Sequence, residues 1–205
     1  MKRIILLLAA VAGLCLSASA APKQKADQNT VISISFHDGA KLVWPFEGKS
    51  TQVPTSARDE NPLLGKETAF TVRGSSHVFK FCPSTTLVRN SKRGIRFGSK
   101  VGDYIEFPAI PGQAVTKVVL VSGATNGNCG NPKITDASGA DVEGGAAWTG
   151  NKQTGEEHSW VLSGLKAGEP ARLVLSSKYT CDIFGISVYY QVPGKVKKVK
   201  KAKVK

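Results

Sequence analysis

Ligands for metal ions and cofactor-binding motifs are scarce in this chain of 205 residues. It has four cysteines and no C-x-x-C pair, and its three histidines, His37, His77 and His158, are scattered. A zinc site needs such residues gathered at short spacings. We therefore expect no metal and no cofactor.

Catalytic motifs are also missing. No G-x-S-x-G occurs, and although Asp103, Glu106, Glu156 and Glu157 are present, no motif singles out a pair of carboxylates. A glycosidase needs two carboxylates held about 5 or about 9 Å apart. We expect a protein that is not an enzyme and has no catalytic residues. A hydrolase remains as a lesser alternative.

Long apolar runs are limited to one stretch, Ile4 to Leu16, which follows Lys2 and Arg3 and precedes Ala18-Ser19-Ala20. This order is typical of a secretory signal peptide at residues 1–20, cleaved after Ala20. A membrane anchor is the alternative, but the run is shorter than the roughly 20 residues that cross a bilayer. Leu14 before Cys15 argues against lipidation. The prediction is a periplasmic or extracellular protein.

Acidic residues are few, and the net charge is +13. Two of the 28 basic residues lie in the leader and seven lysines lie in 195–205, which leaves 19 basic and 15 acidic residues elsewhere, a charge of +4. We expect residues 193–205 to be a disordered tail that attracts polyanions, or one that only aids solubility. The candidate contacts are Lys197, Lys198, Lys200 and Lys201.

Three cysteines, Cys82, Cys129 and Cys181, remain after removal of the leader. An oxidising compartment favours disulfide formation, and three different single disulfides are possible among these cysteines. We predict a disulfide between Cys129 and Cys181. Cys129 follows one expected strand and Cys181 precedes another, and antiparallel neighbouring strands would bring the two together. Cys82 is expected to be a small buried hydrophobic residue.

No helical period persists along the chain, and short alternating runs recur between Gly, Pro, Asn and Asp. In 31–36, Ile32, Ile34 and Phe36 share one face, as in a half-buried strand. Further strands are expected near 41–44, 68–73, 77–81, 85–89, 95–97, 103–107, 115–121, 133–135, 158–163, 172–176 and 181–190. These features predict one all-β domain at 30–192, with 21–29 disordered.

Three segments resemble galactose-binding-like jelly rolls, in particular family 6-type carbohydrate-binding modules. They are Gly102-Asp-Tyr-Ile-Glu-Phe-Pro108, followed by Pro111-Gly112 and the apolar strand 115–121, then Trp160-Val-Leu-Ser-Gly164, and finally 181–190. The resemblance covers roughly 97–190 and implies a single antiparallel β-sandwich of jelly-roll type. Those modules open with acidic residues that hold calcium, whereas residues 36–46 here read Phe-His-Asp-Gly-Ala-Lys-Leu-Val-Trp-Pro-Phe, so no calcium site is expected. Trp44-Pro45-Phe46 resembles uncharacterised secreted proteins of gut-type Gram-negative bacteria.

Sugar binding by a sandwich needs flat aromatic faces and nearby polar groups. The candidates are Trp148, Trp44, Asn126, Asn128 and Asn131. Each has an alternative: Trp148 as a cap on the sandwich, Trp44 as part of a closing apolar cluster, and the asparagines as turn residues.

Two further groups are expected to be structural. Trp160 shares a face with Leu162 and should lie in the core, and Asp136, Ser138 and Asp141 fit a hairpin turn better than a calcium loop. The sequence thus predicts a secreted glycan-binding module. The leading rival is a structural or adhesive envelope protein that binds partners through sheet edges or the tail.

Overall fold

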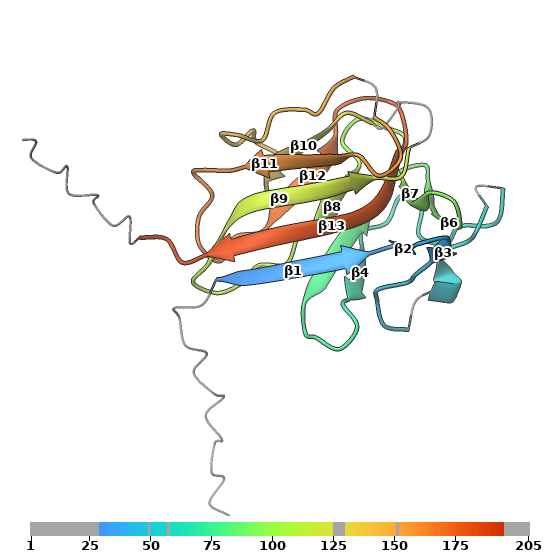
Figure 1. Ribbon diagram of the computed structural model, residues 1–205, viewed down its shortest axis with the longest axis horizontal. Coiled ribbons are helices and arrows are strands. Elements are labelled where there is room, and N and C mark those ends of the chain that lie inside the picture. Colours follow the sequence, from blue (N-terminus) through green and yellow to red (C-terminus); the bar gives the residue numbers. More distant parts are fainter. Residues whose placement is uncertain (1–28, 49, 57, 125–129, 151, 195–205) are drawn as a thin grey trace, which may run out of the picture.

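Two antiparallel sheets packed face to face form the protein (Figure 1). The computed structural model describes residues 29–48, 50–56, 58–124, 130–150 and 152–194. The described residues contain no α-helix, so the all-β sandwich expected from the alternating runs is confirmed. Residues 1–20, which we expect to form a signal peptide, residues 21–28 and the lysines of the tail lie outside the described residues, and the expectations for them stay predictions.

One sheet has six strands in the order β11-β9-β13-β7-β6, with β1 also paired to β13. Its strands are β1 (Thr30–Ser35), β6 (Leu87–Asn90), β7 (Gly94–Phe97), β9 (Ala114–Ser122), β11 (Glu157–Val161) and β13 (Cys181–Gln191). β13 is long enough to pair with β7 along its first part and with β1 along the rest. β9 lies between the edge strand β11 and β13, and only one of its faces is fully covered.

The other sheet has five strands in the order β10-β12-β8-β5-β4. They are β4 (Thr68–Thr71), β5 (Val78–Cys82), β8 (Tyr104–Glu106), β10 (Pro132–Asp136) and β12 (Ala171–Leu175). A small hairpin, β2 (His37–Asp38) with β3 (Lys41–Leu42), and a short turn of 3-10 helix, η1 (Ser50–Gln52), lie outside both sheets. From β8 to β13 every connection crosses from one sheet to the other.

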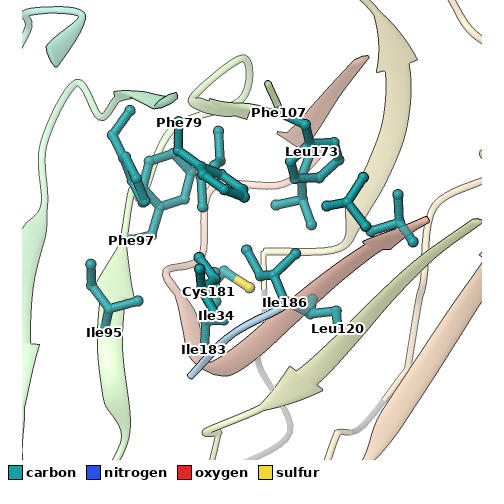
Figure 2. Packing of buried hydrophobic residues seen from close by; sticks show 14 of the residues in the cluster. Ile34, Phe79, Ile95, Phe97, Phe107, Leu120, Leu173, Cys181, Ile183 and Ile186 are labelled. Carbon is teal, nitrogen blue, oxygen red and sulfur yellow. The ribbon is translucent and has the colours of Figure 1, made fainter. Parts of the chain in front are cut away.

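Strand alternation places the apolar side chains between the sheets. Figure 2 shows Phe79, Phe107 and Leu173 of the five-stranded side facing Ile34 and Ile186 of the six-stranded side. Each of these side chains is no more than 4% exposed.

Cys82 departs from what we expected of it. Phe79 and Phe81 occupy the core face of β5, so the next residue points the other way. Cys82 is accordingly half-buried on the outer face of the sheet, and the prediction of a buried residue is wrong.

Phe46 closes the interior on one side. It comes from the connection after β3, forms a bridge with Val72 beside β4, and is fully buried. Its ring centroid lies 5.3 to 6.0 Å from those of five other aromatic side chains. These are Phe36, Trp44, Phe70, Phe79 and Phe81. Phe46 thus ties the end of β1 to the five-stranded sheet.

The chain covers the free edges of three outer strands with its own backbone. The residues that do so are 45–47 beside β4, Pro54 beside β6 and 140–148 beside β10. Their hydrogen bonds include Glu47 N to Thr71 O, Arg89 N to Pro54 O and Ile134 N to Gly145 O. Residues 143–144 lie against the end of β11. Covered edges cannot pair with other chains.

Replacing Phe46 by alanine should lower the free energy of unfolding by about 3 to 5 kcal/mol, because the cavity left among five aromatic rings cannot collapse. Urea denaturation measures the change. Val161→Ala is the control, since Val161 is 72% exposed, and should change stability by less than about 0.5 kcal/mol. Equal losses in the two variants would contradict the role given to Phe46.

Candidate functional site

The outer face of the five-stranded sheet carries a row of three side chains across neighbouring strands. Tyr104 of β8 is paired with Val174 of β12, and Val174 is paired with Lys133 of β10. All three are half-buried and alternate with core residues, so they point to the same side, away from the interior. Val174 lies in the middle of this row, and the longer side chains of Tyr104 and Lys133 lie on either side of it. Val174 thus forms the floor of the space between them.

A hollow of about 560 Å³ lies over this row. We call it the Tyr104 hollow. Its lining combines one aromatic ring, apolar groups, two cations, two serines and two glycines, namely Val101, Gly102, Tyr104, Lys133, Ser138, Gly139, Arg172, Val174, Leu175 and Ser176. Hollows of 290 and 350 Å³ also occur on the described surface, at the end where the chain enters and leaves the sandwich.

Glu106 anchors the charged groups beside the hollow. It is only 6% exposed, and one carboxylate oxygen accepts hydrogen bonds from Nε and Nη2 of Arg172 at 2.9 and 2.8 Å. Its other oxygen lies 3.0 Å from Nζ of Lys80. Both cations come from neighbouring strands in register with Glu106, so the sheet itself brings the three together.

Tyr104 and Glu67 complete a closed ring of interactions with these groups. The hydroxyl of Tyr104 donates to Glu67, whose other oxygen lies 3.3 Å from Lys80. The guanidinium of Arg172 lies 4.2 Å from the centre of the Tyr104 ring, a cation-π contact. Each side chain is therefore held from two directions, and one face of the Tyr104 ring is already covered.

The pKa shifts in this ring agree with its geometry. The hydrogen bond from Tyr104, and then the bond from Lys80, hold the pKa of Glu67 below its ordinary value. The carboxylates Glu106 and Glu67 raise the pKa of Lys80. Burial, and then the bond to Glu67, raise the pKa of the Tyr104 hydroxyl. At neutral pH the tyrosine stays neutral while Glu67 and Lys80 stay charged, so their charges cancel.

Trp148 and Asn131, two of the residues expected to bind a sugar, come together through Lys152. Nζ of Lys152 donates to Oδ1 of Asn131 at 2.9 Å and lies 5.3 Å from the centre of the Trp148 ring. Trp148 stacks on His158 at 4.9 Å and is only 8% exposed, so it caps the sandwich, as its alternative interpretation held. Asn131 has a φ of 43°, which suits the turn interpretation.

Asn131 also borders the Tyr104 hollow. Its carbonyl accepts a hydrogen bond from the hydroxyl of Ser176, which lines the hollow. Trp44, in contrast, packs against Phe70 at 5.5 Å and is 8% exposed. Its indole N–H is buried without a hydrogen-bond partner among the described residues. Trp44 therefore belongs to the closing apolar cluster.

Other expected residues have mixed outcomes. Trp160 is 2% exposed, which confirms its place in the core, and Asp136 accepts bonds from Ser138 and Ala140 in the expected turn. Asn126, Asn128 and Cys129 lie outside the described residues. No disulfide joins Cys82 to Cys181, the two cysteines that the structure describes, and pairing of Cys181 with Cys129 stays a prediction.

Lys80, Arg172 and Glu67 were not identified from the sequence. Alternation along single strands does place Lys80 between Phe79 and Phe81, and Arg172 before the core residue Leu173. The missing information was which strands are neighbours, since β12 lies between β8 and β10 although it follows both in sequence.

The geometry defines a β-sandwich with a polar hollow on one sheet. No protein-family model matches the chain, and no curated protein matches it. Over the residues that the structure describes, none of the helical turns has the length and apolarity to span a bilayer.

Glu106→Gln should lower the free energy of unfolding by about 2 to 4 kcal/mol, because it removes the buried carboxylate charge that both Lys80 and Arg172 contact. Chemical denaturation gives the value. Glu169→Gln is the matched control, since its pair with Lys166 is exposed, and it should cost less than about 0.5 kcal/mol. Comparable losses would contradict a structural role for the ring.

His158 should make stability depend on pH. Burial, and then the charge of Lys152, lower the pKa of its imidazole, so the unfolded chain binds the proton more readily. The neutral imidazole therefore adds to the free energy of unfolding above about pH 6.5, and this contribution is lost as the pH falls through the lowered pKa of His158. In His158→Gln, the unfolding free energy should fall less between about pH 6.5 and 5 than in the wild type.

The wild type measured over the same pH range is the reference for this titration. A slope unchanged in His158→Gln would show that the imidazole does not titrate on unfolding.

Proposed function

We propose that the protein is a secreted, non-catalytic carbohydrate-binding module of jelly-roll type, and that the Tyr104 hollow holds the sugar. One observation carries the proposal: a 560 Å³ hollow in which an aromatic ring and an apolar floor lie beside hydroxyls and backbone groups. Ligand sites have volumes of about 300 to 1,000 Å³ and this mixture of surfaces. The export inferred from residues 1–20 is part of the proposal.

The lining suits a pyranose. A sugar ring has an apolar face made of C–H groups, which fits over Val174 and beside the Tyr104 ring. The oxygens of Ser138 and Ser176 can accept hydrogen bonds from its hydroxyls, while their own protons are donated to Asp136 and Asn131. Lys133 and Arg172 of the lining are donors to sugar oxygens. The site differs from the one predicted from the sequence, because the rings of Trp148 and Trp44 are buried.

A neutral sugar fits better than a charged one. Arg172 is matched by Glu106, and Lys133 lies 2.6 Å from Asp141, so both cations of the lining already have a carboxylate. Polyanion binding by Lys197, Lys198, Lys200 and Lys201 is proposed as a separate, salt-sensitive property.

Catalysis has less support at this site. A glycosidase needs one protonated carboxylic acid, whose pKa is raised. Glu67 has a lowered pKa, and Lys80 lies between it and Glu106. The site therefore offers contacts to a sugar rather than a proton donor.

A glycan array probed with the full chain at high salt tests the proposal, since salt suppresses binding by the lysine tail. Neutral oligosaccharides should bind, and Tyr104→Ala should weaken that binding by about tenfold or more. Val174→Gln should weaken it as well by filling the floor. Tyr179→Ala is the matched control, because Tyr179 is 48% exposed and lies outside the hollow, and should bind like the wild type.

Folding of each variant is checked by near-UV circular dichroism. Binding that survives both Tyr104→Ala and Val174→Gln but is lost in Trp148→Ala would move the site to the Trp148 end. Absence of binding to every glycan would overturn the proposed function.

A further inference from the structure

One edge of the six-stranded sheet, that of β1, is exposed. Phe36, the residue after β1, donates its amide N–H to Phe184 O of β13 at 2.6 Å. The carbonyl oxygen of Ile34 also lies beside Gly185 of β13. Backbone groups alternate between the two sides of an extended strand. Those of Val31, Ser33 and Ser35 therefore point away from β13.

No hydrogen bond from the described residues reaches the N–H or C=O groups on this outer side. The strands β4, β6 and β10 are covered by segments of the chain, and β11 is met at its end by residues 143–144 and carries the charge of Glu157. β1 has none of these protections. It is six residues long and contains no charged residue and no proline. Exposed edges of this kind pair readily with other strands.

We propose that β1 pairs with β1 of a second copy of the chain, antiparallel, around a two-fold axis at Ser33. This register places Ser33 opposite Ser33 and Val31 opposite Ser35. The groups that point outward then meet as hydrogen-bonded pairs, and each pair exchanges both of its N–H···O=C bonds. The edge is thus complementary to itself, as a two-fold interface must be.

The lack of charge in β1 favours a second copy over another partner. In a two-fold interface, a charged residue would meet itself or stand close to its own copy, which is destabilising. Here the facing side chains are Ser33 with Ser33, and Val31, which is 51% exposed, with Ser35. Pairing would join two six-stranded sheets into one continuous sheet.

The dimer leaves the proposed sugar site open, because the Tyr104 hollow lies on the other sheet. An assembly of two copies would present two hollows, and two sites strengthen binding to a polymer of repeated sugars. The pairing itself does not depend on the proposed function.

Sedimentation velocity of the full chain tests the pairing, at concentrations up to on the order of 100 µM. The wild type should form dimers reversibly and nothing larger, since a two-fold interface closes. Ser33→Lys places two positive charges at the axis and should raise the dimer Kd by about tenfold or more. Ser33→Pro removes an outward N–H and should do the same.

Ser159→Lys is the matched control. Ser159, on β11, lies in the same cross-strand row of the outer face as Ser33. The substitution therefore adds the same charge to the same face, but far from the edge of β1. It should dimerise like the wild type. Two results would overturn the proposal: a wild type that stays monomeric over the whole range, and a dimer that survives both substitutions of Ser33.

Discussion

The packing of Phe46 between the two sheets is the interaction on which the rest of the structure depends. Its ring touches Phe70, Phe79 and Phe81 of the five-stranded sheet and Phe36 at the end of β1. Successive side chains of a strand point to opposite faces, so burying Phe79 and Phe81 fixes Lys80 on the outer face. The same core therefore sets which side chains can meet at the Tyr104 hollow.

Around that hollow, charged and polar side chains are paired with one another, so that burying them costs little free energy. Glu106 is almost fully covered, and a lone buried carboxylate would be strongly destabilised. Arg172 and Lys80 bind its two oxygens separately, and Glu67 balances the charge of Lys80 while it accepts a hydrogen bond from the hydroxyl of Tyr104. The result is a rigid surface with little net charge, which suits recognition by shape and hydrogen bonding more than attraction of ions.

Much of the fold could be predicted from the sequence because alternation is a local signal. The runs around Ile32 and Ile186 each mark a strand and its buried face, and the structure has a strand at every expected place. The candidate site depended on contacts between strands far apart in sequence. Tyr104 and Arg172 are neighbours only because β12 pairs with β8. Trp148 illustrates a second difficulty, since a loop of small residues gives no indication of whether an aromatic ring in it turns inward to stack on His158.

Both ends of the sandwich chain lie at one place, where β1 begins and β13 ends (Figure 1). Thr30 is the direct partner of Tyr190, so one strand spacing separates the point of entry from the point of exit. Neighbouring strands lie about 5 Å apart, a gap that a very short peptide can bridge. The sandwich is therefore suited to circular permutation, with a linker joining β13 to β1 and new ends opened in the exposed turn at Gly139 or Gly74.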